Sequence, residues 1–207
     1  MSISNLLAKL LKTRLRPGKS PRAPYKKTRH GLFFALCPEE SVRQELAAVL
    51  ALFPRQLSDD WTSPANLHMR LAMLGGAEAE WLNDLKAVAG AIQSPDFELS
   101  LDRITYWPQK QTLGLAPSVV PAALERLAAD LAGRLDTAGF EMGKHPYRPY
   151  VTLARHATYP PTEIRLAQPI LWKATSFALL KTRPEGLGVA HELVQSWPLL
   201  KTEEALE

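Results

Sequence analysis

The sequence predicts an α+β protein whose two halves repeat one pattern of elements. Apolar residues recur with the period of a helix in three segments, at about 38–53, 78–93 and 119–138, and with the period of a strand elsewhere. Two seven-residue segments, 68–74 and 150–156, also match each other and begin 82 residues apart. We therefore expect a weak internal duplication with one matched strand in each half.

The first half is expected to contain strand, helix, matched strand, helix and strand. Residues 32–37 form an apolar strand, and Pro38 with the two acids after it is typical of a helix start. The matched strand at 67–74 comes next, before the helix at 78–93. The alternating run 97–102 then predicts a half-buried strand.

The second half is expected to follow a similar order. Residues 111–116 should pair with the preceding strand across a turn at Pro108, and Gly139 suits the position just after the third helix. The second matched strand is predicted at 148–155. Three further strands are predicted, at 164–166, 170–181 and 192–197.

The matched segments are the clearest functional signal in the chain. Alternate residues of a strand share a face, which places His68 with Arg70 and Ala72, opposite an apolar face of Leu67, Met69, Leu71 and Met73. By the same rule Tyr150 and Thr152 share a face. Each segment is half of a damaged His-x-Thr-x motif, because the first keeps its His and the second keeps its Thr. The polar pairs should face a cleft or solvent.

The chain resembles the bacterial RNA 2′,3′-cyclic phosphodiesterases, also called 2′-5′ RNA ligases, of the two-histidine phosphoesterase superfamily. The resemblance covers about residues 30–200 and rests on Gly-Leu-Phe-Phe-Ala-Leu at 31–36, Asn-Leu-His-Met-Arg-Leu at 66–71 and Tyr-Arg-Pro-Tyr-Val-Thr-Leu-Ala-Arg at 147–155. It implies a bilobal fold of two antiparallel sheets around a central cleft, with outer helices. It also implies that one motif strand from each lobe lines the cleft, and that neither a metal nor another cofactor is needed.

The resemblance also implies residue roles. In that family two His act as general acid and base on a terminal cyclic phosphate, while Thr hydroxyls and an Arg hold the phosphate. By position, His68 matches the first His, Thr152 the second Thr and Arg155 the phosphate-binding Arg. Arg70 replaces the first Thr, and Tyr150 replaces the second His. The expected site is therefore His68, Thr152 and Tyr150 for catalysis, with Arg70, Arg155 and Thr152 on the phosphate.

The two replacements leave two functions open. An Arg fork grips phosphate in place of a hydroxyl, whereas a tyrosine, which ionises near pH ~10, donates a hydrogen bond but is no base at pH 7. The first hypothesis is an RNA 2′,3′-cyclic phosphodiesterase with weakened chemistry, acting on ends of RNA or on cyclic nucleotides. The second is a catalytically inactive module that binds the phosphate of an RNA end or nucleotide.

Two other histidines, His145 and His156, lie on either side of Tyr150, where the motif histidine is lost. His145 is interpreted as a loop residue in preference to a substitute, and His156 should lie ~20 Å from Tyr150 along a strand. His191 is isolated in the sequence and carries no predicted role. Trp107 could stack a base or belong to the core.

Residues 1–29 differ in charge from the rest of the chain. They hold nine Lys or Arg and no acid, so the other 178 residues carry a net charge of −5 although the whole chain has +4. An apolar stripe at 3–15 with Pro and Gly after it predicts an amphipathic helix and a linker. The helix could contact RNA, an anionic membrane surface or a protein, could pack on its own protein, or could be an organelle transit peptide in a eukaryote.

Domain organisation and compartment complete the prediction. We expect an extension at 1–29, one bilobal domain at 30–200 and a tail at 201–207. A single cysteine, Cys37, forms no internal disulfide, and no apolar run approaches the ~18 residues of a membrane span. These features favour the cytoplasm.

Overall fold

The computed structural model describes residues 31–75, 79–140, 142, 146–157, 163–186 and 188–202. The predictions for the extension at 1–29, for His145 and for most of the tail at 201–207 concern residues outside this part. Within the described part, no helix is both long and apolar enough to cross a membrane.

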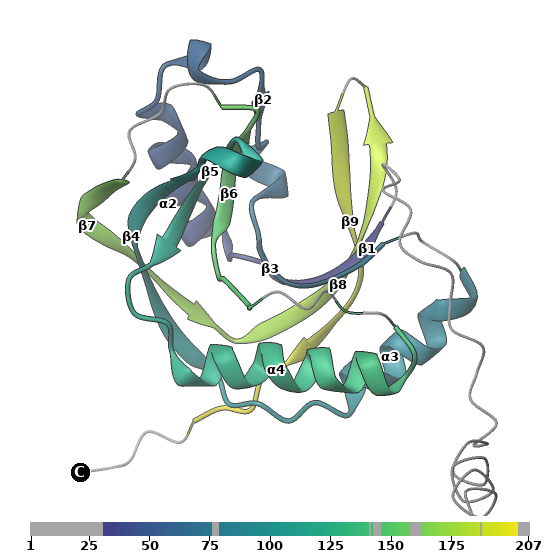
Figure 1. The fold of residues 1–207 in the computed structure, drawn as a ribbon. Coiled ribbons are helices and arrows are strands. Elements are labelled where there is room, and N and C mark those ends of the chain that lie inside the picture. The colour runs from purple at the N-terminus through teal and green to yellow at the C-terminus, as the bar shows by residue number, and fades with distance from the viewer. Residues whose placement is uncertain are drawn as a thin grey trace, which may run out of the picture.

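One antiparallel sheet runs through both halves of the chain and curls into an open half-barrel (Figure 1). Its strands are β1 (Leu32–Leu36), β2 (Asp60–Trp61), β3 (Met69–Gly75), β4 (Phe97–Trp107), β5 (Thr112–Pro117), β6 (Val151–Arg155), β7 (Glu163–Ala174), β8 (Ser176–Glu185) and β9 (Gly188–Pro198). The predicted α+β class with antiparallel strands is confirmed. The two predicted sheets meet where Met69 of β3 pairs with Val151 of β6, and there they join into one.

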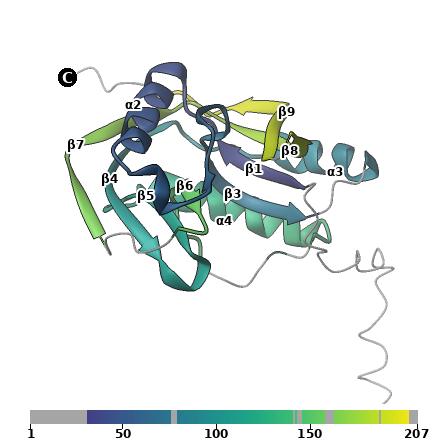
Figure 2. The ribbon, with the colours of Figure 1, turned by 90° about the horizontal axis from the view of Figure 1, so that it is seen from above.

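The strand order confirms the predicted duplication. It reads β7-β4-β5-β6-β3-β1-β8-β9, with β2 paired to β6. The two matched strands, β6 and β3, lie side by side in the middle (Figure 2). On either side of them β5 corresponds to β1, β4 to β8 and β7 to β9. The sheet therefore has approximate twofold symmetry about the matched pair.

Each matched strand contains a β-bulge at the same place. In β3, Leu71 is the extra residue that has no partner in the pairing with β1. In β6, Leu153 is the extra residue in the pairing with β5. Both follow the third residue of the matched segments. An extra residue reverses the alternation of side chains beyond it. The bulges therefore decide which face the later residues of each segment reach.

The bulge at Leu71 corrects one prediction. Met73 was expected on the apolar face with Leu67 and Met69, but it packs against Phe33 on the concave side of the sheet. Ala72, expected beside His68 and Arg70, is buried in the main core instead. A sequence pattern that assumes strict alternation cannot show this reversal.

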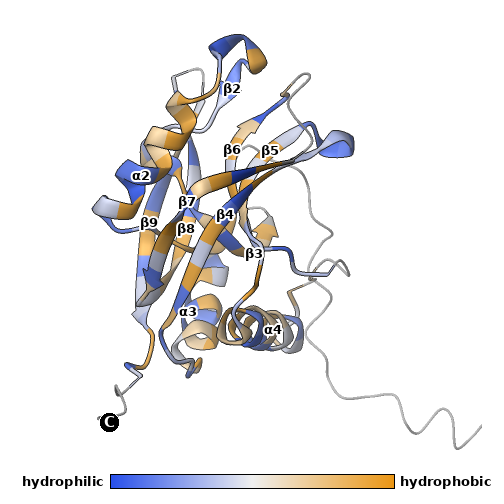
Figure 3. Cartoon of the chain, turned by 90° about the vertical axis from the view of Figure 1, so that its left-hand side faces the viewer, coloured by the Kyte–Doolittle hydropathy of each residue, from blue (hydrophilic) through white to orange (hydrophobic). Residues whose placement is uncertain are grey.

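In the described part of the chain, three α-helices cover the outer side of the sheet: α2 (Glu40–Ala51), α3 (Leu82–Gly90) and α4 (Ala122–Thr137). α2 and α4 each carry apolar and polar stripes (Figure 3). The apolar stripe of α4 is buried in the main core through Leu124, Leu127, Ala128, Leu131 and Leu135. Gly139 follows α4 with φ of +85°, which glycine adopts without strain and which confirms its predicted place.

The last third of the chain differs from the prediction. The strands expected at 164–166 and 170–181 are instead one strand at 163–174 and a second that begins at Ser176. Pro169 does not end β7, because β7 lies at the edge of the sheet and the stretch around Pro169 is an irregularity in its pairing with β4. β9 is longer than the predicted 192–197, and its added residues reach His191.

Candidate active site

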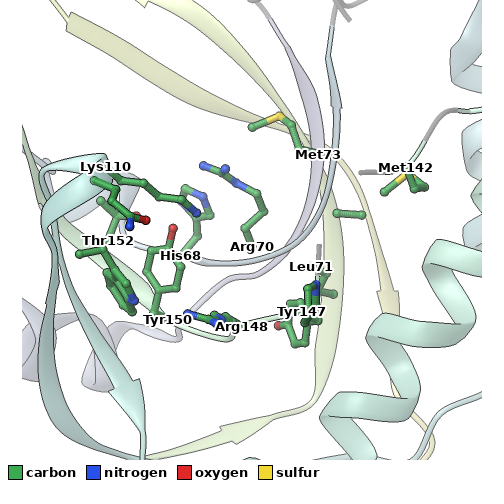
Figure 4. A pocket seen from close by; sticks show the side chains of 14 residues that line it. His68, Arg70, Leu71, Met73, Lys110, Met142, Tyr147, Arg148, Tyr150 and Thr152 are labelled. Carbon is green, nitrogen blue, oxygen red and sulfur yellow. The ribbon is translucent and has the colours of Figure 1, made fainter. Parts of the chain in front are cut away.

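The pairing of β3 with β6 brings the two damaged motifs together. Because Met69 pairs with Val151 in antiparallel register, His68 lies opposite Thr152 and Arg70 lies opposite Tyr150. These four side chains line one cleft of about 470 Å³ (Figure 4). Residues 82 positions apart in the chain thus share one site.

His68 is held at the edge of β3 in a defined state. It is 7% exposed, and its Nδ1 lies 2.7 Å from the backbone carbonyl oxygen of Asn66. A carbonyl oxygen only accepts, so Nδ1 carries the proton of this hydrogen bond. In the neutral ring Nε2 is then the nitrogen with the free lone pair. The local backbone therefore prepares Nε2 to accept a proton.

The surroundings of His68 keep it neutral. The pKa of His68 is lowered to about 3, chiefly by burial and further by His191, Arg70 and Arg155, while the hydrogen bond to Asn66 opposes part of this shift. At neutral pH the ring is therefore uncharged. A bound phosphate would offset the two guanidinium charges and raise the pKa of His68 again.

The cleft is cationic. The Arg70 guanidinium lies 5.9 Å from the centre of the Phe33 ring, and in Figure 4 it points into the same space as the Tyr150 hydroxyl. Lys110 and Arg148 also line the cleft, and none of its described lining residues is an acid. This is opposite in sign to residues 30–207 as a whole, which carry net negative charge. The cleft is therefore suited to an anion.

Arg155 acts on the same region from the end of β6. The bulge at Leu153 sends Ala154 into the core, and the charge of Arg155 lowers the pKa of both His68 and His191. The Ser58 hydroxyl donates to the carbonyl oxygen of Arg155 and so fixes this end of the strand. Arg155 is thus close enough to add positive field at the cleft, although it is not among the residues that line it.

Two residues near the site carried no role in the sequence prediction. Lys110 lies in the short helical turn that joins β4 to β5, and only the folding of that hairpin brings it to the cleft. His191 was interpreted as isolated, which is wrong: its ring centre lies 5.0 Å from that of His68. No local pattern reveals a contact between residues 123 positions apart. His156, by contrast, is 74% exposed beside Asp60.

Aromatic side chains form one wall of the cleft. The ring centres of Trp107 and Tyr150 are 4.4 Å apart, so Trp107 packs on Tyr150. Both rings lie over Gly114 of β5, which has no side chain to keep them away. The hydroxyl of Tyr147, also in the lining, is buried without a hydrogen-bond partner in the described part of the chain. A ligand oxygen could supply that partner.

Replacing Gly114 with Ala is expected to lower the free energy of unfolding by about 1–3 kcal/mol. The added Cβ would lie 2.8 Å from Trp107 Cζ3 and 2.9 Å from Tyr150 Cδ2, so both rings must move. Urea denaturation measures the change. The control is Gly133→Ala in α4, where the added Cβ meets nothing within 4 Å. Because alanine has a higher helix propensity than glycine, this variant should raise the free energy of unfolding by at most about 1 kcal/mol. Equal stability of the two variants would contradict this packing.

Comparison with known proteins agrees with the fold. A family model described as the 2′-5′ RNA ligase superfamily matches residues 30–185. The chain belongs to this superfamily. The resemblance seen in the sequence is therefore confirmed at the level of the family.

Individual members of the 2′-5′ RNA ligase superfamily support the same placement. The chain is 31% identical over 160 residues to the RNA 2′,3′-cyclic phosphodiesterase of Escherichia coli (strain K12). The aligned region covers 73% of this chain and 90% of that protein. E. coli LigT in complex with 3′-AMP superposes with a TM-score of 0.77 at 27% identity, over 82% of this chain and 98% of that chain. E. coli LigT in complex with phosphate superposes with a TM-score of 0.73 at 26% identity, over 83% of this chain and 98% of that chain.

Proposed function

We propose that this protein hydrolyses 2′,3′-cyclic phosphates at the ends of RNA or on nucleotides. The observation that carries the proposal is the placement of His68 opposite Thr152 in a cationic cleft. Family membership supports it, since a superfamily relative is an RNA 2′,3′-cyclic phosphodiesterase and LigT forms complexes with 3′-AMP and with phosphate. RNA ends and cyclic nucleotides are the proposed ligands.

In this proposal the phosphate is held by groups from both matched strands. Arg70 binds two of its oxygens through the planar guanidinium, and the Thr152 hydroxyl donates to another. Arg155 contributes charge from the end of β6. Lys110 and Arg148 lie where the next phosphate of an RNA chain could pass, because both line the same cleft. The arrangement replaces one hydroxyl of the family motif by a stronger phosphate ligand.

The proposed chemistry is an attack by water on phosphorus. His68 Nε2 takes the proton of the water, the new phosphorus–oxygen bond forms, and the bond to one ribose oxygen breaks. The Tyr150 hydroxyl gives its proton to the departing ribose oxygen, the proton taken up by His68 then returns to Tyr150 through solvent, and the product is a phosphomonoester. Because a tyrosine is a weaker acid than a histidinium, this step is expected to be slower than with the complete motif.

The test is incubation of the full-length protein with an oligoribonucleotide that ends in a 2′,3′-cyclic phosphate. Conversion to a phosphomonoester, followed by electrophoresis, is the expected result. The same oligonucleotide with a linear terminal phosphate should remain unchanged and serves as the control. If the cyclic end persists at all enzyme concentrations, the hydrolase proposal fails.

The replacement of His by Tyr150 favours one second function, a phosphate-binding module without turnover. It predicts saturable binding of an oligonucleotide with a terminal phosphate, measured by fluorescence anisotropy. Arg70→Ala should weaken the binding about tenfold or more, because hydrogen bonds to a charged group typically contribute about 1.5–3 kcal/mol and Arg70 lines the cleft. The control is Arg134→Ala, which removes an exposed Arg paired with Asp130 on α4. Equal affinity of both variants would contradict this function.

A further inference from the structure

Three aromatic rings from three strands or their ends meet beside the cleft. The ring centres of Phe33 and His68 are 4.8 Å apart, those of Phe33 and His191 are 4.9 Å apart, and those of His68 and His191 are 5.0 Å apart at an interplanar angle of 90°. Each ring therefore contacts both others. The rings of Phe33 and His191 both restrict the plane in which His68 can lie.

Asn66 holds both His191 and His68 through hydrogen bonds. The backbone N–H of His191 donates to Asn66 Oδ1 at 3.0 Å, and Asn66 Nδ2 donates to the carbonyl oxygen of Val189 at 2.6 Å. The backbone carbonyl oxygen of Asn66 accepts from His68. The Thr182 hydroxyl lies 3.3 Å from His191 Nδ1. Asn66 thus ties the start of β3 to β9 and places both imidazoles against each other.

We infer that His191 is a positioning residue for His68. The hydrogen bond from Nδ1 to Asn66 leaves the His68 ring free to tilt about that bond, and the rings of Phe33 and His191 limit the tilt. His68 is the one histidine left in the two motifs, so its orientation decides the proton transfer. Small displacements of a reacting group lower rates strongly. The kinetic part of this inference rests on the proposed function.

The charges around His68 are consistent with this role. The groups that face it are Arg70 on its own strand, Arg155 on β6 and His191 on β9, with Lys110 and Tyr150 in the same cleft. Burial lowers the pKa of His191 to about 4, with help from Arg155 and Arg70, so it is neutral at pH 7. A neutral ring excludes water from His68 without adding charge, which favours the unprotonated base.

The kinetic test compares His191→Ala with His191→Phe. Loss of the ring in His191→Ala is expected to lower kcat about tenfold or more with little change in KM. The Phe ring preserves the packing, so His191→Phe should retain kcat within about threefold. Wild-type kcat in His191→Ala would overturn the inference. An equal loss in both variants would also overturn it, because a nitrogen of His191 would then act directly.

The second test does not need turnover. Titration of the full-length protein by NMR should find His68 neutral down to about pH 5 in the wild type and in His191→Phe. In His191→Ala, water reaches the ring and the midpoint should rise toward ~6.5. An unchanged midpoint in His191→Ala would overturn the inference. If the wild type lacks turnover but the midpoint moves as expected, the proposed function fails while the positioning role stands.

Discussion

His68→Ala is expected to lower turnover of a 2′,3′-cyclic phosphate end by about 10²–10⁴. The variant removes the imidazole that lies opposite Thr152 in the paired matched strands and whose Nε2 is left to accept a proton. Binding should change much less, because the cations of the cleft remain. Initial rates at saturating and limiting substrate separate the two effects.

The matched control for this variant is His156→Ala. His156 follows β6, so it is close in the fold, but it is 74% exposed and points to Asp60. Its removal should leave kcat and KM unchanged. Equal rates in His68→Ala and the wild type would show that the observed hydrolysis has another source, and equal losses in both variants would show an effect on folding.

The double variant Arg70→Thr with Tyr150→His is expected to raise kcat by about 10²–10⁴. It restores both His-x-Thr-x motifs on strands that already lie in the required register. The restored histidine would protonate the departing ribose oxygen more readily than Tyr150, because a histidinium is the stronger acid. The result is measured as kcat on the cyclic-phosphate oligonucleotide.

The single variants make this prediction sharper. Tyr150→His alone should recover most of the gain, because the proton donor limits the rate, whereas Arg70→Thr alone should mainly weaken binding. Residues that act as a unit are not additive, so the double variant need not equal the product of the two. No gain in Tyr150→His would mean that the cleft is not arranged for this reaction.

Much of the fold follows from local patterns in the sequence. Helical spacing gave the three helices, because the apolar stripes of α2, α3 and α4 are regular. Alternation within the matched segments predicted the polar face that carries His68 and Arg70, whereas the direct pairing of the two matched strands came only from the structure. The helices and this polar face depend on neighbours within a few residues, which a single sequence shows directly.

The parts that the sequence did not reveal depend on distant contacts. The bulge at Leu71 moved Met73 to the concave face, and nothing within β3 marks where an extra residue falls. His191 seemed isolated because its partner Asn66 lies 125 positions away. Lys110 reached the cleft through the geometry of a hairpin turn. In each case the position is set by the closure of the sheet rather than by the local sequence.

A crystal structure of the full-length protein with a nucleoside 2′-monophosphate will show whether the matched strands form one phosphate site. We expect the phosphate between β3 and β6, within hydrogen-bonding distance of Arg70, Thr152 and His68 Nε2. Crystals grown without the nucleotide, in the same solution, give the control density. A nucleotide bound with its phosphate elsewhere, and with these three side chains unoccupied, would contradict the account.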